Sequence, residues 1–172
     1  MTNLTMRYPA AATAMLATIL LVGCGGLMKS PADGLTFRAP DGWQTTPGIM
    51  GRFQLWMTGE DKDKQVLVLL KLPPQAKIDK SFNLDLVNGP NSGGVKDVQV
   101  VSRRQMTLCG NQPSLYLMMR GESSRNKVEE NLEAVFSKAT DSTYMAMYVY
   151  PVGTAPNARA EAAISELCRS TP

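Results

Sequence analysis

The sequence predicts an α+β domain in which an antiparallel β-sheet is flanked by helices. In three segments, 50–57, 113–121 and 144–150, the side chains divide at every second residue into two different faces, as they do in strands. Residues 65–72 are apolar on both faces, which predicts a central strand that is covered on both sides. An Ala-rich segment with helical spacing of apolar residues follows Pro156 and predicts a terminal helix.

Residues 1–23 are predicted to be a lipoprotein signal peptide that precedes this domain. Arg7 is the only charged residue before Lys29, and the apolar run that follows it is too short for a comfortable membrane span. The run ends in Leu-Val-Gly-Cys, with Cys24 as its last residue. This tetrapeptide resembles the lipobox of bacterial lipoproteins. The resemblance implies cleavage before Cys24 and acylation of its sulfur and its new amino group, for example by palmitate.

Acylation at Cys24 implies a membrane-anchored protein of the cell envelope. At about 0.8 kcal/mol for each buried methylene group, several acyl chains hold a protein on a bilayer essentially permanently. Gly25 follows the cysteine in place of Asp. In enterobacterial lipoproteins this favours the outer membrane, facing the periplasm, over the inner membrane. Residues 24–34 carry Gly, Ser and Pro without periodicity and are predicted to be a lipidated tether. The alternatives are an ordinary secretory signal and a short uncleaved helix.

Two cysteines remain besides the predicted lipidation site, Cys109 and Cys168. Their even number, in a compartment where thiols oxidise, predicts one disulfide. The bond would close a loop of about 60 residues and stabilise the fold by roughly 4 kcal/mol in the chain-entropy description. The alternative is two separately buried, reduced cysteines.

Within the mature chain, residues 35–172 are predicted to be a single domain that starts with strands. The elements expected in its first half are a strand over 35–40 that ends at an Asp41-Gly42 turn, a strand over 50–57, a charged hairpin turn over 59–64, the central strand over 65–72 and a short helix over 78–87. Two prolines, Pro73 and Pro74, stop the central strand.

The second half is predicted to contain four strands and a helix. They are expected over 95–108, 113–121, 127–138 and 144–150 for the strands and over 157–169 for the helix. The segment 127–138 fits a helix as well as a strand. Turn-forming residues at 140–142 lead us to choose a long hairpin, and therefore a strand.

The order of elements and one short motif resemble the PsbP-like group of proteins. The motif is Phe-x-x-Pro-x-Gly-Trp over 37–43, and later a Cys-Gly pair precedes a strand and a helix closes the chain. The group includes photosystem PsbP proteins, a nuclear-import Ran-binding factor and many bacterial lipoproteins. The resemblance implies an α/β/α sandwich and a habit of binding other proteins, and it transfers no set of functional residues. Without it, the motif is an aromatic pair that anchors a turn in the core.

The composition excludes several classes of function. No histidine occurs in the 172 residues, which excludes Ser-His-Asp and Cys-His nucleophiles, His-ligated zinc or haem, and imidazole pH switches. The formal net charge of +3 is too small and too evenly spread to indicate a nucleic-acid partner. We therefore expect no catalytic residue, no metal and no cofactor.

Four groups of residues could still carry chemistry or ligands. They are the strand methionines Met106, Met118, Met119, Met145 and Met147 as Cu(I) ligands, Ser124 with Lys127 as a Ser-x-x-Lys nucleophile motif, Glu60, Asp61 and Asp63 as a cation loop, and Glu129, Glu130 and Glu133 as the carboxylates of a hydrolase. Each has a structural alternative: core packing for the methionines, chance for the serine motif, and solvated surfaces for the two acidic groups. Arg103 and Arg104 are expected to be an ordinary exposed pair.

These features together predict a non-catalytic envelope lipoprotein that binds or supports another envelope protein. The combination of an anchor, a short tether, one domain and no catalytic constellation carries this expectation. The alternative is a module that binds a small molecule or a lipid between the sheet and its helices. A hydrolase that uses carboxylates alone is a third hypothesis.

Overall fold

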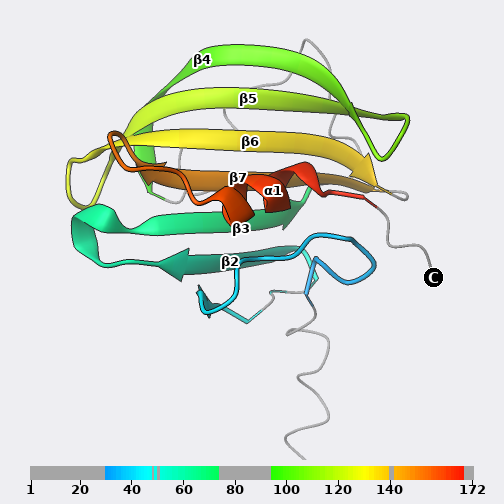
Figure 1. Cartoon of the computed structure of the whole chain (residues 1–172), viewed down its shortest axis with the longest axis horizontal. Helices are drawn as coiled ribbons and strands as arrows, with labels where there is room; N and C mark the ends of the chain where they lie inside the picture. The colour runs from blue at the N-terminus through cyan, green and yellow to red at the C-terminus, as the bar shows by residue number, and fades with distance from the viewer. Residues whose placement is uncertain (1–29, 48, 50, 74–93, 140–141, 169–172) are drawn as a thin grey trace, which may run out of the picture.

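Seven strands form one antiparallel sheet, in the order β1-β2-β3-β7-β6-β5-β4 (Figure 1). The computed structural model describes residues 30–47, 49, 51–73, 94–139 and 142–168. The strands are β1 (Gln44–Thr45), β2 (Phe53–Thr58), β3 (Gln65–Lys71), β4 (Val95–Leu108), β5 (Gln112–Ser123), β6 (Glu129–Ala139) and β7 (Ser142–Pro151). Because β3 pairs with β7 in the middle of the sheet, β1 and β4 are its two edges among the described residues.

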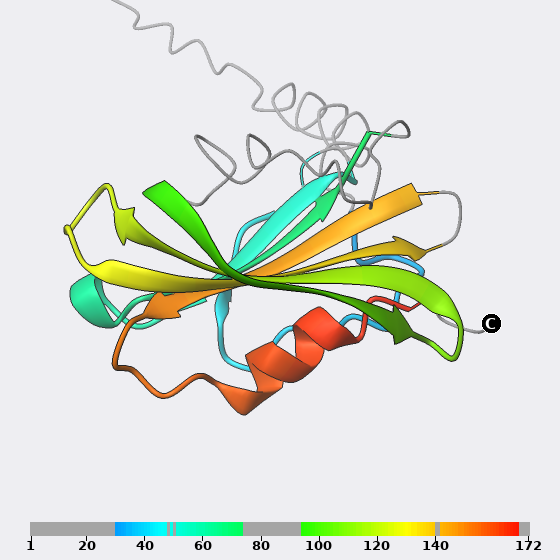
Figure 2. The same cartoon turned by 90° about the horizontal axis from the view of Figure 1, so that it is seen from above.

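The described chain is mainly β, so the predicted α+β class is wrong. Among the described residues the one α-helix is α1 (Ala158–Ser165), and it lies on one side of the sheet (Figure 2). The described residues therefore do not form a sheet flanked by helices, nor the α/β/α sandwich that the PsbP-like resemblance implied. The short helix predicted over 78–87 lies outside the described residues.

The terminal helix is shorter than predicted. It was expected over 157–169, but it ends at Ser165. Beyond that point the chain leaves helical geometry, and the carbonyl of Cys168 accepts a hydrogen bond of 2.8 Å from the N–H of Thr36. Thr36 lies near the beginning of the domain in sequence, more than 100 residues from Cys168. The spacing of apolar residues could not reveal it, because the spacing reports only which side of a helix would be buried.

The predicted strand over 35–40 is also wrong. Only Leu35 forms an isolated bridge, and the rest of the segment runs over the α1 side of the sheet without joining it. Phe37 is buried and its ring lies 5.3 Å from the ring of Trp56 on β2. An extended segment that packs on a sheet alternates apolar and polar residues just as a strand within the sheet does. Alternation alone therefore could not separate the two cases.

The remaining strand predictions are confirmed. β2, β3, β4, β5 and β7 occur where the side-chain patterns predict them, and the ambiguous segment 127–138 is the strand β6. On β7 the two predicted faces are separated as expected. Tyr144, Tyr148 and Tyr150 face the α1 side, and Met145, Met147 and Val149 face the opposite side.

Apolar side chains are buried on both sides of the sheet. On the α1 side the largest are Phe37, Leu67, Leu69, Tyr148 and Ile164. On the opposite side they are Leu115, Leu117, Met119, Leu132, Phe136, Met145 and Met147. Side chains of this size that are removed from water contribute about 1.5–3 kcal/mol each to folding, so both sides of the sheet stabilise the domain.

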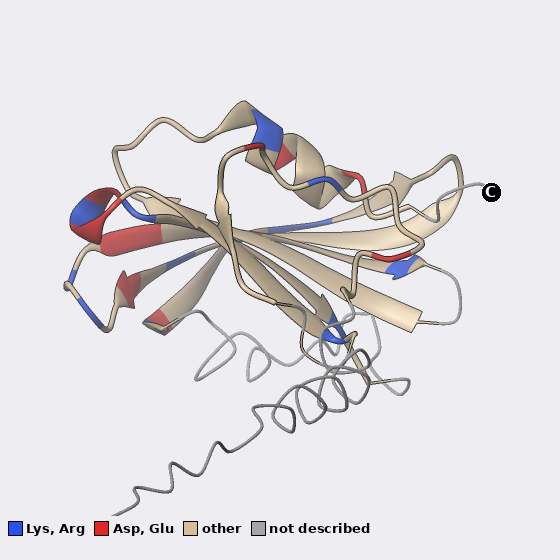
Figure 3. Cartoon of the chain, turned by 90° about the horizontal axis from the view of Figure 1, so that it is seen from below, with Lys and Arg blue, Asp and Glu red and all other residues tan. Residues whose placement is uncertain are grey.

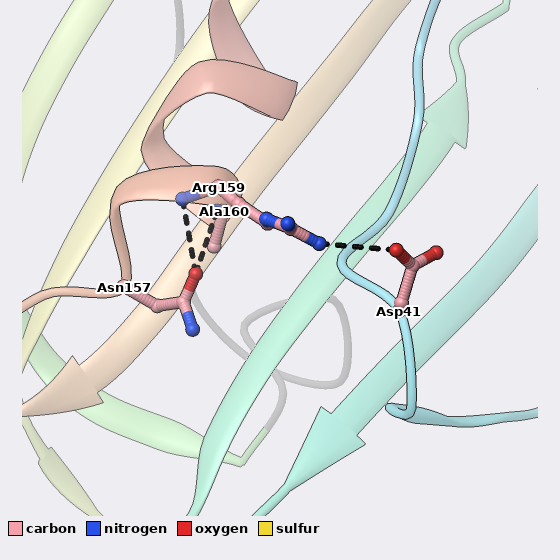
Figure 4. A network of polar contacts seen from close by, with 4 residues as sticks. All are labelled: Asp41, Asn157, Arg159 and Ala160. Carbon is pink, nitrogen blue, oxygen red and sulfur yellow. Dashed lines mark hydrogen bonds and ion pairs between the residues drawn. The ribbon is translucent and has the colours of Figure 1, made fainter.

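The start of α1 is fixed by a side-chain cap and lies next to the predicted turn. The Asn157 side-chain oxygen accepts hydrogen bonds from the backbone N–H groups of Arg159 (3.0 Å) and Ala160 (3.2 Å), which satisfies two donors that a helix start leaves free (Figure 4). The Arg159 guanidinium pairs with Asp41 at 3.0 Å, at the Asp41-Gly42 turn. Both partners are well exposed, so this ion pair adds little stability.

The two ends of the sheet differ in character. At the end that we call the disulfide end, a disulfide joins Cys109 in the β4–β5 turn to Cys168 beyond α1, with Cα atoms 5.7 Å apart. Ser30, where the described chain starts, donates a 2.5 Å hydrogen bond to Gln54 near the start of β2, at this same end. Charged residues gather at the other end, at the β2–β3 and β5–β6 turns (Figure 3), and we call it the charged end.

Replacing both bridged cysteines by serine should lower the free energy of unfolding by about 2–4 kcal/mol. The bond joins residues 59 apart in sequence, and without it the unfolded chain regains the freedom of that loop. Urea unfolding of the double variant Cys109→Ser/Cys168→Ser, followed by circular dichroism, measures the loss. Cys24→Ser is the matched control and should leave the transition of the domain unchanged. An unchanged midpoint in the double variant would contradict the prediction.

Candidate functional site

The long edge strand β4 is exposed along its middle. Gln99–Gln105 are seven consecutive exposed residues, and two of them are valines, Val100 at 40 % and Val101 at 57 % exposure. In the central strand β7, by contrast, every residue after Ser142 is buried. Figure 1 shows the reason, because β4 lies at the border of the sheet and no strand among the described residues pairs with its outer edge.

Two irregularities divide β4 into unlike halves. The register with β5 shifts at 96–99 and again at 100–102, as it does at β-bulges. Asp97 lies in the first shift with a φ of +54°, a left-handed conformation that Asp tolerates better than most residues. We call Lys96–Val101 the bulged half and Ser102–Leu108, which pairs with β5 without interruption, the regular half.

A buried carboxylate holds two tyrosines beside the regular half, on the α1 side. Glu133 on β6 accepts a 2.8 Å hydrogen bond from the Tyr116 hydroxyl at Oε2 and a 2.7 Å bond from the Tyr150 hydroxyl at Oε1. The Arg104 guanidinium lies over the Tyr116 ring, 4.4 Å from its centroid. These four residues, which we call the tyrosine–glutamate network, connect β4, β5, β6 and β7 through side chains.

The network keeps both tyrosines in their neutral form. Burial raises the pKa of Tyr116 above its ordinary value, and the hydrogen bond to the Glu133 carboxylate and the charge of that carboxylate raise it further. The same causes raise the pKa of Tyr150. An ionised tyrosine could not donate to Glu133 and would bring a second negative charge next to it. The arrangement therefore suits packing and positioning, because neither hydroxyl is prepared to lose its proton.

The three glutamates considered as a hydrolase centre are not brought together. Successive residues of a strand point to opposite sides of the sheet, so Glu130 faces away from Glu133. Glu129 is exposed at the start of β6, and burial raises the pKa of half-buried Glu130. General acid and base catalysis by two carboxylates needs both groups around one substrate bond, and these three do not share a surface.

The methionines considered as Cu(I) ligands are divided between the two sides of the sheet. Met119, Met145 and Met147 are fully buried in the core of the opposite side. Met106 and Met118 are half-buried on the α1 side, and the Met118 sulfur lies 3.9 Å from the Tyr116 hydroxyl. The first three pack as core residues, and the five do not form one cluster of sulfur atoms.

The two charged motifs lie in turns at the charged end. Ser124 and Lys127 belong to the β5–β6 turn, where the ammonium group of Lys127 lies 3.4 Å from a carboxylate oxygen of Glu122. Asp61 and Asp63 form a short 3-10 turn between β2 and β3. Within the described residues, no group of three acidic, cysteine or histidine side chains is placed to hold a metal ion.

A cavity of about 310 Å³ lies at the charged end, and no sequence pattern predicts it. Its walls come from both turns and the start of β4, and its lining includes Lys64, Val66, Gly94, Arg125, Glu130 and Val149. The charge of Lys64 opposes the rise in the pKa of Glu130 that burial causes. Because cations and carboxylates mix in the lining, the cavity selects no class of ligand by charge.

The predicted lipidation residue Cys24 lies outside the described residues. Among the helices that the structure describes, none has the length and apolarity to cross a bilayer. Arg103 and Arg104 are both exposed, as expected, but the sequence did not place them on an edge strand. Edge position depends on which strands pair over long distances, and the nearest local signal was the weak alternation of 95–108.

Comparisons with known proteins add little. No protein-family model matches the sequence, and no curated protein matches it. Among solved structures, a Pseudomonas aeruginosa protein of unknown function, described as a candidate regulator, aligns with a TM-score of 0.40 and 10 % sequence identity. The alignment covers 66 % of this chain and 75 % of that one. A likeness at this level carries no argument about fold or function.

Changing Glu133 to Gln should lower the pKa of Tyr116 and Tyr150 toward the ordinary value of 10.0, without reaching it because burial remains. In the unchanged protein, the raised pKa values of the two tyrosines stabilise the folded state. This contribution is fully present below pH 10.0 and is lost as the pH rises above it, because tyrosines of the unfolded chain ionise before those of the folded chain. Ultraviolet titration of tyrosine ionisation measures the shift.

The control for this prediction is Glu161→Gln. Glu161 acts on both tyrosines through its charge alone, without a hydrogen bond, so its removal should shift their titration less. Identical titration curves for the Glu133→Gln variant and the unchanged protein would show that the network does not control these two groups.

Proposed function

We propose that the chain is a lipid-anchored, non-catalytic protein of the bacterial envelope that binds another envelope protein. The exposed middle of β4 is the observation that carries this proposal. A strand edge offers a row of backbone donors and acceptors to another chain, and natural proteins that do not use such an edge keep it short, cover it, or protect it with bulges and charged residues along its length. β4 is instead 14 residues long, and its middle carries exposed valines.

The anchor in this proposal is Cys24. The lipobox-like sequence that ends at this residue and the preceding apolar run support export and acylation, and Gly25 favours the outer membrane, facing the periplasm. The tether is short, because five residues separate Cys24 from Ser30, where the described chain begins. An anchor with a short tether suits a protein whose partner also lies at the membrane.

A binding role fits the described residues better than catalysis or a ligand pocket under the helix. The chain has no histidine, and its candidate carboxylates are spread over both sides of the sheet. The space between α1 and the sheet is filled, since Ala160, Ala163 and Ile164 are at most 1 % exposed. No observation therefore favours a small molecule or lipid between sheet and helix.

Replacing Cys24 by Ser should release the protein from the membrane fraction. The serine hydroxyl cannot form the thioether to diacylglycerol, so the variant lacks the acyl chains that hold a lipoprotein on a bilayer. Cell fractionation and labelling with radioactive palmitate measure the effect, with the double variant Cys109→Ser/Cys168→Ser as the control that stays acylated. A Cys24→Ser variant that remains labelled and membrane-bound would contradict the anchor.

A photo-crosslinking residue introduced at Ser102 or Gln105 should give one discrete adduct in living cells. The same residue at Ser165, which is exposed on the far end of α1, should not give that adduct. Mass spectrometry of the adducts identifies the partner and must find the same protein from both β4 positions. A lack of any specific adduct, from any exposed position of the domain, would overturn the binding role.

A further inference from the structure

We infer that the partner supplies an extended, acidic segment that pairs with the outer edge of the regular half of β4 as an eighth strand. This inference rests on the proposed function and specifies the chemistry of the partner. Addition of a strand to a sheet edge is a common mode of peptide recognition, in which backbone hydrogen bonds give affinity and alternate side chains give specificity.

The bulges decide which part of the edge is available. A bulge bends a strand and interrupts its ladder, which is one way in which proteins protect an edge from pairing. Both register shifts of β4 lie in its bulged half, with Val101 as the extra residue of the second shift. The regular half is seven residues long, about 23 Å at 3.3 Å per residue, which is enough for a short peptide strand. It therefore carries the binding site.

Charge on the regular half favours an acidic partner. Arg103 and Arg104 point to opposite sides of the sheet, because they are successive residues of a strand. On the α1 side, the nearby carboxylate of Glu133 already accepts two tyrosine hydrogen bonds. An added strand with acidic residues opposite both arginines would place a carboxylate near each of them, one on each side of the sheet.

The positions next to the arginines add an apolar requirement. Met106 lies two residues from Arg104 on the same side of β4 and is half-buried. It lines a hollow of about 260 Å³ together with Gln105 and Thr107 of β4 and Pro113 and Ser114 of β5. An added strand that sets a carboxylate opposite Arg104 sets its second-next residue near this hollow. The fitting segment therefore carries an apolar residue two positions from an acidic one.

A second copy of this chain is a poorer occupant of the edge. Antiparallel pairing of two β4 strands would gather four arginines along one short strip. In the two-fold registers centred on Arg103 or on Arg104, an arginine would face its own copy directly. Like charges directly opposite each other destabilise a strand pair, whereas opposite charges stabilise it. The arginines thus act against self-association and in favour of an acidic strand.

The test uses the full-length chain in detergent micelles and a synthetic peptide, acetyl-Leu-Thr-Glu-Glu-Thr-Leu-amide. Its sequence is the same in both directions, so a leucine lies two positions from a glutamate whichever way it runs. We expect saturable chemical-shift changes at the amides of Ser102–Thr107 and slower hydrogen exchange there. A peptide with lysines in place of both glutamates should not bind. Equal binding of the two peptides, or no saturable binding of the first, overturns the inference.

Two further comparisons separate strand addition from simple charge attraction. The backbone nitrogens of an extended peptide form two alternating sets, and only one of them faces the edge of β4. Methylation of that set should abolish binding, and methylation of the other set should not. Arg104→Glu should weaken binding by at least about tenfold, while Arg52→Glu, the same change at an exposed residue next to β2, should not. If both methylated sets bind alike, the partner does not form a strand.

Failure of this inference can be told apart from failure of the proposed function. If crosslinking in cells finds one partner from another surface and the peptide does not bind, the binding role stands and the β4 edge is not its site. If no position gives a specific adduct, the binding role itself fails. If the adducts from Ser102 and Gln105 are lost in the Arg104→Glu variant but persist in Arg52→Glu, both proposals are supported together.

Discussion

Burial of the central strand on both of its faces is the constraint on which the rest of this structure depends. Every residue of β7 after Ser142 is buried, with tyrosines on one side and methionines and a valine on the other. A strand of this kind must have neighbours on both edges and cover on both sides. β3 and β6 supply the edges, and on one side α1 and the segment around Phe37 supply the cover. The exposed strand residues therefore lie toward the edges of the sheet, and most of them belong to β4.

The cover on the α1 side is held by contacts from distant parts of the chain. Gln112 at the start of β5 donates a 3.0 Å hydrogen bond to the carbonyl of Leu167, and Thr36 donates to the carbonyl of Cys168. The disulfide adds a covalent bond at the same place. A helix of eight residues is too short to be stable by itself, so these contacts and the burial of Ile164 keep it on the sheet.

Local periodicity allowed most strands to be predicted. The features that it did not predict depend on contacts between residues that are far apart in sequence. β7 and β3 were predicted because their side-chain patterns report directly on two covered faces. β6 was chosen over a helix from the turn residues that follow it. The fold class was wrong because the described residues carry one short helix, on one side of a seven-stranded sheet, and apolar spacing does not reveal where that helix ends. The segment 35–40 was wrongly predicted as a strand because it packs over the sheet with the alternation of one. In the candidate site, Glu133 and the two arginines were noticed as residues, but their roles depend on β5 and β7 lying beside them.

If Cys24 is acylated as we propose, the hydrogen bond between Ser30 and Gln54 keeps the whole domain within a short reach of the bilayer. Six residues from Cys24 to Ser30 extend at most about 20 Å. The edge of β4 lies five strand spacings from β2, about 24 Å across the sheet. A partner segment must then come within roughly 45 Å of the membrane surface. When both proteins are confined to so thin a layer, their effective concentration is high, and one short strand of modest affinity is enough to hold them together.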